Sequence, residues 1–179
     1  MENRNLELKD ICGYLPYGLE FLYIDGRSIY PLWCLFPNVN NNFTNERIIW
    51  EITHNQFKPI LRPLSDLYKK ITHNGKEIIP IVECAKITFG EFEFWLGENS
   101  MENPCAIVIT DELDEFGYNE NINLYYSQEF GFITDSTEFL MKNQIQLFDY
   151  LNELKIDYRG LIDAGLAIDC NALKDNPYK

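Results

Sequence analysis

Two histidines are the side chains best suited to acid–base or metal chemistry, and they occur in identical surroundings. His54 and His73 each lie within an Ile-Thr-His-Asn tetrapeptide, although the flanking residues do not agree. A zinc site normally needs three or four Cys or His ligands at close spacing, and neither histidine has a second such ligand nearby. Because Asn favours turns, we expect both histidines at turns or helix ends.

A run of acidic residues is the second chemical candidate. It comprises Asp111, Glu112, Asp114 and Glu115. An EF-hand calcium loop needs a glycine at its sixth position and a glutamate at its twelfth. With Gly117 placed sixth, the twelfth residue is Asn123, so the pattern fails. Three interpretations stay open for these four residues: a solvated acidic loop, a docking loop for a partner with a basic surface, and a weak divalent-cation site.

Nucleophilic and phosphate-binding motifs do not occur in the sequence. There is no GxSxG elbow, no GxxxxGK[ST] loop and no GxGxxG loop, and no cysteine lies near a histidine. We therefore assign no catalytic residue, no cofactor and no metal ligand. Catalytic triads that assemble in space leave no local pattern. A small enzyme or ligand-binding domain using tyrosines, acids and Cys84 or Cys105 thus stays an alternative.

The cysteines indicate a reducing environment. They are odd in number, far apart and without a CxxC pair: Cys12, Cys34, Cys84, Cys105 and Cys170. Isolated cysteines of this kind usually behave as small, buried apolar side chains. We predict reduced, mostly buried thiols that bind no metal.

The charge of the chain is concentrated in one section. Between Lys86 and Lys142 there is no lysine or arginine, and residues 87–141 carry a formal −12 of the total −13. Its acids are Glu91, Glu93, Glu98, Glu102, Asp111, Glu112, Asp114, Glu115, Glu120, Glu129, Asp135 and Glu138. Such a section attracts cations and basic surfaces, and it repels nucleic acid and anionic membranes. We therefore expect neither nucleic acid nor membrane as a partner.

Length and composition limit the class of protein. A chain of 179 residues, 46% apolar and 15% aromatic, is suited to one globular domain over residues 1–179 with a substantial core. No window approaches the ~18 apolar residues of a membrane span, and the N-terminus lacks the pattern of a signal peptide. We expect a soluble protein of the cytoplasm.

The elements that would position these residues alternate between strands and helices. The sequence predicts helices at 6–12, 65–71, 78–86, 138–154 and 160–166. In 138–154 the apolar face includes Ile145, Phe148 and Leu151, and Asn74-Gly75 is expected to close the helix at 65–71.

Strands are predicted from aromatic and β-branched runs. Their ranges are 20–24, 29–36, 48–52, 91–96, 106–109, 121–126 and 129–133. Asp25-Gly26-Arg27 indicates a hairpin turn, Pro31 favours an edge strand, and residues 176–179 are expected to be a tail. The pattern predicts an α+β fold, with a mainly antiparallel sheet and a few helices packed on one side.

Four strings in the sequence resemble a known group of proteins. They are residues 8–19, 58–67, 146–157 and 158–169. They resemble an uncharacterised family carried by phages and prophages of Bacteroides-like gut bacteria. The resemblance covers both ends and the 58–86 region, and it implies a phage-borne accessory role rather than a housekeeping reaction. The family has no assigned activity, so no catalytic residue is implied.

Polar residues within these strings are expected to serve the scaffold. Tyr14 and Tyr17 are typical of buried, hydrogen-bonded tyrosines, and Arg62 and Arg159 of arginines that flank helices.

Three functional hypotheses follow. The leading one is a non-enzymatic binder of a host or phage macromolecule that uses its acidic section, with DNA mimicry against a host defence protein as one form. The second is a small enzyme or ligand-binding domain, and the third is a self-associating structural protein. A one-sided acidic surface would favour the first, and acids converging in an apolar cleft the second.

Overall fold

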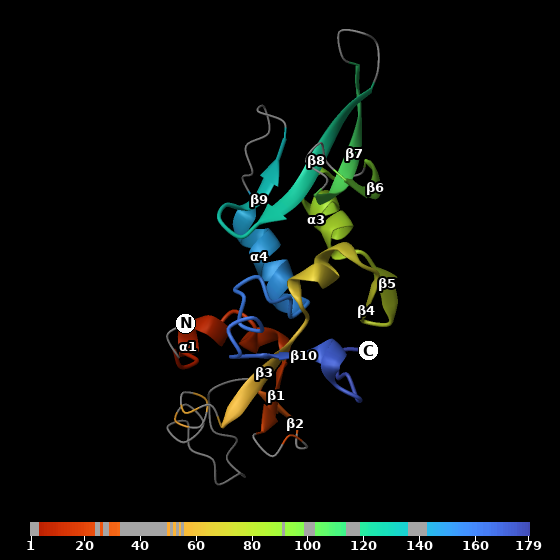
Figure 1. The fold of residues 1–179 in the computed structure, drawn as a ribbon. Coiled ribbons are helices and arrows are strands. Elements are labelled where there is room, and N and C mark those ends of the chain that lie inside the picture. Colours follow the sequence, from red (N-terminus) through yellow and green to blue (C-terminus); the bar gives the residue numbers. More distant parts are fainter. Residues whose placement is uncertain are drawn as a thin grey trace. The chain divides into compact units, whose positions relative to one another are not determined.

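A computed structural model describes most of the chain. It covers residues 4–23, 26, 29–32, 50, 52, 54, 56–90, 92–98, 103–113, 119–135 and 143–179, with residues 30–32, 110–113 and 119–120 described by their backbone alone. Contacts divide the chain into two compact units. The first comprises Met1–Leu64 with Leu151–Tyr178, and the second comprises Ser65–Tyr150 (Figure 1). A single domain over 1–179 stays a prediction.

The first unit is built on a four-stranded sheet in the order β10-β3-β1-β2. Its strands are β1 (Leu19–Tyr23), β2 (Ile29–Leu32), β3 (Phe57–Leu61) and β10 (Ile168–Asp169). β1 pairs antiparallel with β2 and β3, whereas the short β10 pairs parallel with β3. The predicted hairpin across Gly26 is confirmed, and β2, which contains Pro31, lies at the edge of the sheet.

Short helices complete the first unit. They are α1 (Leu8–Ile11), η1 (Leu15–Tyr17) and η3 (Cys170–Ala172). In α1 the side chains and backbone N–H groups of Glu7 and Asp10 form a capping box, which satisfies two otherwise unpaired donors. The core of this unit contains Leu6, Ile11, Tyr14, Leu15, Leu19, Phe21, Ile52, Leu61, Leu161, Leu166 and Ala167.

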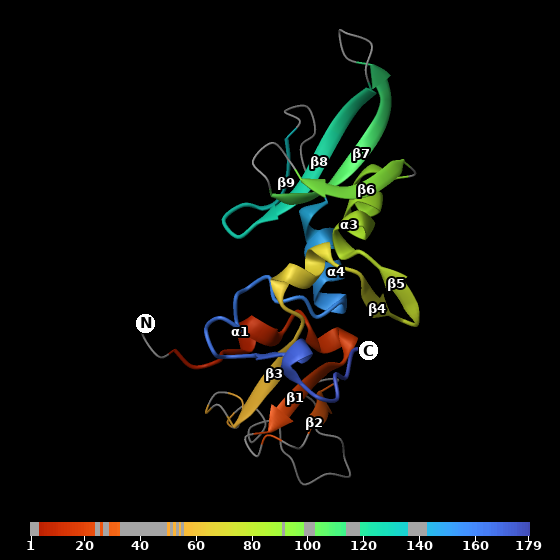
Figure 2. The same ribbon diagram turned by 45° about the vertical axis from the view of Figure 1, so that its right-hand side comes forward.

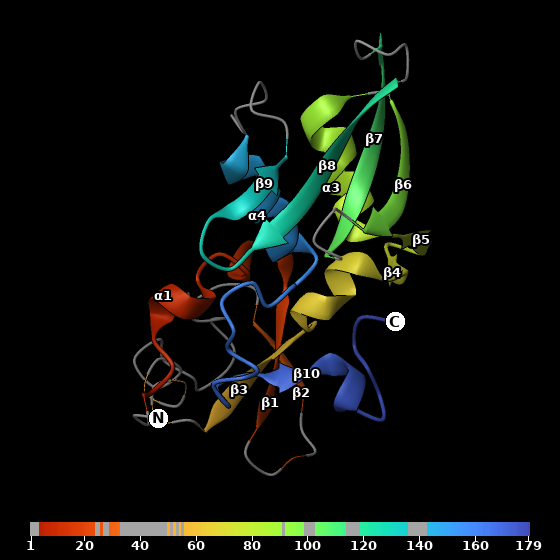
Figure 3. The ribbon, with the colours of Figure 1, turned by 45° about the horizontal axis from the view of Figure 1, so that its top comes forward.

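The second unit is built on an antiparallel sheet in the order β6-β7-β8-β9. Its strands are β6 (Glu93–Glu98), β7 (Pro104–Leu113), β8 (Asn119–Ser127) and β9 (Gly131–Thr134). Helices α3 (Pro80–Phe89) and α4 (Gln144–Glu153) lie on one side of this sheet (Figure 3). The α+β class and the mainly antiparallel pairing are confirmed.

A hairpin and a 3₁₀ helix precede this sheet. The 3₁₀ helix η2 spans Leu64–Tyr68, and the hairpin pairs β4 (Ile71–His73) with β5 (Lys76–Ile78) (Figure 2). The prediction that Asn74-Gly75 closes a helix is wrong. Both residues have positive φ, 49° and 73°, which is the backbone that a tight two-residue hairpin turn requires.

Three other predicted elements need correction. The strand predicted at 48–52 is wrong at its described positions, because Trp50 and Ile52 are helical and His54 N donates to Trp50 O at 2.9 Å. The segment 160–166 forms consecutive turns rather than a helix. The tail is held in place from Asn176 to Tyr178, because the Tyr178 hydroxyl donates to Ile60 O at 2.7 Å.

The helix predicted at 138–154 is confirmed from Gln144 to Glu153, while residues 138–142 lie outside the described part. Leu151 is fully buried, as predicted. Phe148 is only half-buried, and Ile145 is 86% exposed, so the apolar face is narrower than the spacing indicated.

Candidate interaction surface

The β6–β9 sheet has one covered face. Along the strands, alternate side chains belonging to Ala106, Val108, Leu124 and Phe132 have almost no exposed area. Helix α3 packs against β6, β7 and β8, and the ring of Phe148 in α4 lies 5.9 Å from that of Phe132. Because successive residues of a strand point to opposite faces, the intervening side chains belong to the other face.

That other face, which we call the open face, carries two apolar cross-strand pairs. Trp95 pairs with Ile107, and Tyr125 pairs with Ile133. Trp95 is 45% exposed, and the other three side chains are half-buried. An accessible tryptophan beside half-buried aliphatic side chains is the composition found at the centre of many protein interfaces.

A polar network around Asn123, the β8 partner of Ile107, adjoins these pairs. The thiol of Cys105 donates to Asn123 Oδ1 at 3.6 Å, and the amide of Asn123 donates to the carboxylate of Asp135. Asp135 also accepts from Asn123 N at 2.8 Å. Burial, and then the charges of Asp135 and Glu98, raise the pKa of the Cys105 thiol. This thiol is therefore a protonated hydrogen-bond donor rather than an activated nucleophile.

Carboxylates stand at the margins of the same sheet. Glu93 and Glu98 lie on the edge strand β6, Glu129 lies in the turn between β8 and β9, and Asp135 follows β9. All four are exposed. By strand alternation, Glu93 shares the open face with Trp95. The part of residues 87–141 with described side chains therefore combines accessible apolar area with negative charge.

The four predicted partner-binding acids lie at the far end of β7 or beyond it. Asp111 and Glu112 belong to β7, and Asp114 and Glu115 lie outside the described residues. The β7–β8 register shifts between Ile109 and Leu113, a span that includes Asp111 and Glu112. Such irregularities often occur where a strand redirects side chains at its end. The binding role predicted for these four acids stays a prediction, and the sequence analysis did not select Trp95 or the open face.

Both histidines occupy turn positions, as predicted. His73 is the last residue of β4, directly before the Asn74-Gly75 turn. His54 lies in a turn where its ring stacks on that of Trp50 at 4.2 Å, and its Nδ1 lies 2.8 Å from Trp50 O. In the part of the chain that the structure describes, no group of three or more His, Cys, Asp or Glu side chains is placed to hold a metal ion.

Cysteine burial agrees with the prediction at most described positions. Cys84, Cys105 and Cys170 are buried and Cys12 is exposed, while Cys34 lies outside the described residues. Burial also raises the pKa of the Cys84 thiol well above its ordinary value.

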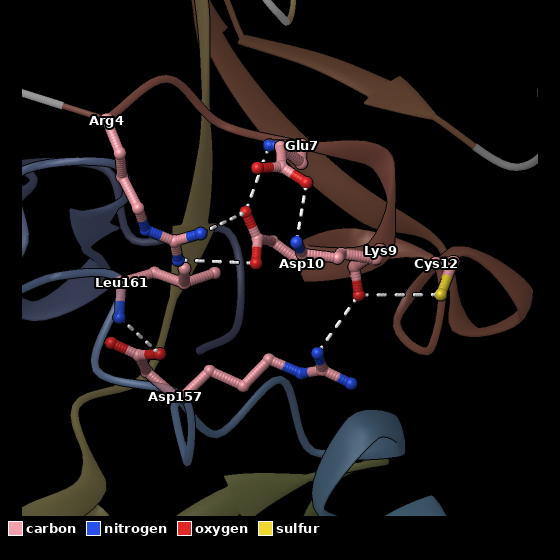
Figure 4. Close-up of polar contacts among 8 residues, drawn as sticks. Arg4, Glu7, Lys9, Asp10, Cys12, Asp157 and Leu161 are labelled. Carbon is pink, nitrogen blue, oxygen red and sulfur yellow. Dashed lines mark hydrogen bonds and ion pairs between the residues drawn. The ribbon is translucent and has the colours of Figure 1, made fainter.

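Buried carboxylates in the first unit serve its backbone. Asp10 is 4% exposed, accepts from Glu7 N at 2.9 Å and pairs with Arg4 at 3.2 Å (Figure 4). This carboxylate ties the segment before α1 to its first turn.

Asp157 performs a similar task at the other end of the chain. Its two carboxylate oxygens accept from Leu161 N at 2.9 Å and from Ile162 N at 2.7 Å, the first of which is drawn in Figure 4. Burial raises the pKa of Asp157, although these backbone donors act in the opposite direction. Both buried acids therefore stabilise the local backbone, Asp10 before α1 and Asp157 before Leu161.

Comparisons with known proteins leave the site to be argued from its own chemistry. No family model matches the chain, and neither a curated protein nor a solved structure gives a significant match. Among the described helices, none has the length and apolar character to cross a membrane.

Proposed function

We propose that this chain is a non-enzymatic binding protein that engages a basic protein partner through its acidic section, residues 87–141. The observation that carries the proposal is the coincidence of two features on one sheet. The section without lysine or arginine forms β6–β9, and the open face of that sheet carries the 45% exposed Trp95. Apolar contact would supply affinity, and the surrounding carboxylates would supply orientation and association rate.

The resemblance to phage and prophage proteins supports an accessory role inside a bacterial host cell. One concrete form is DNA mimicry, in which carboxylates take the place of phosphates in the basic channel of a defence nuclease. A protein of this kind needs no cofactor, and its partner would be a protein rather than nucleic acid or membrane.

Capture from a Bacteroides lysate tests the proposal. The immobilised full chain should retain a protein with a basic surface, identified by mass spectrometry, and about 0.5 M salt should release it because charges at the rim of an interface are screened. Retention that is indifferent to salt, or retention of acidic proteins alone, would contradict binding through the acidic section.

A matched pair of tryptophan variants tests the open face with the captured partner. Trp95→Ala should weaken binding by about tenfold or more, because a central aromatic side chain commonly contributes at least 1–2 kcal/mol. Trp50→Ala is the control, since Trp50 is 53% exposed and belongs to the first unit. Equal losses in both variants would place the contact elsewhere. A concentration-dependent increase in mass of the chain alone would instead favour self-association.

A further inference from the structure

Tyr178 is held by two segments of the first unit, β1 and the end of β3. Its hydroxyl donates to Ile60 O of β3 at 2.7 Å and accepts from Glu20 N of β1 at 3.4 Å. Its backbone carbonyl accepts from Arg62 Nη2 at 2.5 Å. Both the phenol and the main chain of Tyr178 therefore form hydrogen bonds with the first unit.

Two cationic side chains flank the ring of Tyr178. The Arg62 guanidinium carbon lies 5.5 Å from the ring centre, and Lys155 Nζ lies 5.9 Å from it. An aromatic ring attracts such cations through its negative faces, and more strongly where water is excluded. Arg62 is only 5% exposed. Burial, together with the charge of Arg62, lowers the pKa of Lys155, while Glu153 and Glu20 oppose that change.

Main-chain bonds that do not involve Tyr178 position these two cations. Arg62 N donates to Lys155 O at 2.8 Å, and Asp157 N donates to Arg62 O at 2.8 Å. The other two contact groups, Ile60 O and Glu20 N, belong to the paired strands β3 and β1. The backbone that carries the site is therefore held by contacts within the first unit that do not involve Tyr178.

The backbone at Lys155 belongs to the cap that ends α4. Lys155 has φ 59°, Lys155 N donates to Asn152 O at 3.1 Å and Ile156 N donates to Leu151 O at 2.9 Å, which is the bonding pattern of a left-handed helix cap. The end of α4 therefore fixes the position from which the Lys155 side chain extends.

The segment that carries Tyr178 lies on the unit as a bound peptide would. Between η3 and Tyr178 the described residues form neither helix nor strand, and Asp175 and Pro177 are exposed. Asn176 Oδ1 accepts from Tyr178 N at 2.9 Å, so the segment forms its own turn. The Asn176 side chain also donates to Asn171 Oδ1 at 3.5 Å.

We propose that the surface formed by Glu20, Ile60, Arg62 and Lys155 is a peptide-binding site for tyrosine-bearing segments, which the chain's own Asn176–Tyr178 segment occupies. A tyrosine-bearing segment of another protein binds there by displacing it. The site selects an unmodified tyrosine, because the hydroxyl must both accept from Glu20 N and donate to Ile60 O. Phenylalanine lacks both bonds, and a phosphate ester has no hydroxyl hydrogen to donate. This inference rests on the first unit and is independent of the acidic section.

Peptide binding by the full chain carrying Tyr178→Ala tests the inference. The probe is the fluorescently labelled peptide Lys-Asp-Asn-Pro-Tyr-Lys, followed by fluorescence polarisation. The variant should bind it saturably and about tenfold or more tightly than the wild-type chain, whose own segment competes at a high effective concentration. The phenylalanine peptide should bind about tenfold more weakly, because two hydrogen bonds are lost, and the phosphotyrosine peptide should not bind.

Two further variants test the same site. If Tyr178→Ala does not fold, Tyr178→Phe retains the ring but weakens the resident segment, so it should bind the tyrosine peptide more tightly than wild type does. In the folded variant, adding Lys155→Asn should reduce peptide binding, because Asn tolerates the left-handed backbone but lacks the ammonium group. No saturable binding to a folded variant, or equal binding of the tyrosine and phenylalanine peptides, would overturn the inference.

Discussion

Single side chains in this protein are fixed by partners that lie far away in the sequence. The Tyr14 hydroxyl donates to Ile156 O at 2.9 Å across 142 positions, and Tyr14 is fully buried. The sequence could predict a buried, hydrogen-bonded tyrosine here, because the surrounding leucines are typical of a core. It could not predict the partner. The position of Tyr178 was still harder to predict from the sequence, because a short polar segment contains no pattern that indicates where its aromatic ring will lie.

Leu151 is the clearest test of packing at the scale of one residue. Leu151→Ala should lower the free energy of unfolding by about 2–5 kcal/mol, because the fully buried side chain would leave a cavity. Ile145→Ala in the same helix is the matched control. Ile145 is 86% exposed, so its truncation should change that free energy by no more than about 0.5 kcal/mol. Denaturant titration measures both, and equal changes would show that Leu151 is peripheral.

At the scale of elements, local patterns predicted most of the strands and the two main helices. Helix α3 was recognisable because Ile78, Ile81, Val82 and Ala85 repeat at intervals of three and four residues, and Pro80 is tolerated in a first helical turn. One error occurred where strand pairing decides the structure. The sequence of residues 71–78 does not by itself distinguish a hairpin from the end of the helix predicted at 65–71. The pairing of Ile71 with Ile78 makes this segment a hairpin. The sequence could not predict which face of the sheet is open either. The alternation of side chains along a strand is the same whichever face the helices cover.

The Asn74-Gly75 turn gives a test at this scale. Gly75→Ala should lower the free energy of unfolding by about 1 kcal/mol, because its φ of 73° is unfavourable for a residue with a Cβ. No atom lies within 4 Å of the position that this Cβ would take, so the effect would come from backbone strain alone. Glu77→Ala, at an exposed position of the same hairpin, is the control. Identical melting temperatures for the two variants would contradict the positive-φ turn.

At the scale of the whole molecule, charge is the property that sequence determines most completely. Residues 87–141 carry −12 regardless of how they fold. What the sequence could not determine is which face of which element presents that charge. The structure places four described carboxylates of this section, Glu93, Glu98, Glu129 and Asp135, in exposed positions on and around one sheet. Their mutual repulsion must oppose folding.

This repulsion predicts stabilisation by salt. The melting temperature should rise between about 10 mM and about 0.5 M sodium chloride, since the screening length falls from about 30 Å to about 4 Å. The rise should be smaller when Asp111, Glu112, Asp114 and Glu115 are changed to their amides. A melting temperature that is independent of salt, or that falls, would show that the acidic section does not strain the folded protein.

The most direct test of partner binding through the acidic section compares two quadruple variants of equal charge. The first carries Asp111→Asn, Glu112→Gln, Asp114→Asn and Glu115→Gln. The control carries Glu77→Gln, Asp149→Asn, Asp163→Asn and Asp175→Asn, at exposed positions outside residues 87–141.

Affinity for the captured partner, measured across a series of salt concentrations, separates a local contact from net charge. We expect the first variant to bind more weakly with a flatter salt dependence, and the control to retain the affinity and salt dependence of the wild-type chain. If the first variant binds as the wild-type chain does at every salt concentration, the acidic section is a solvated surface and docking through it is contradicted.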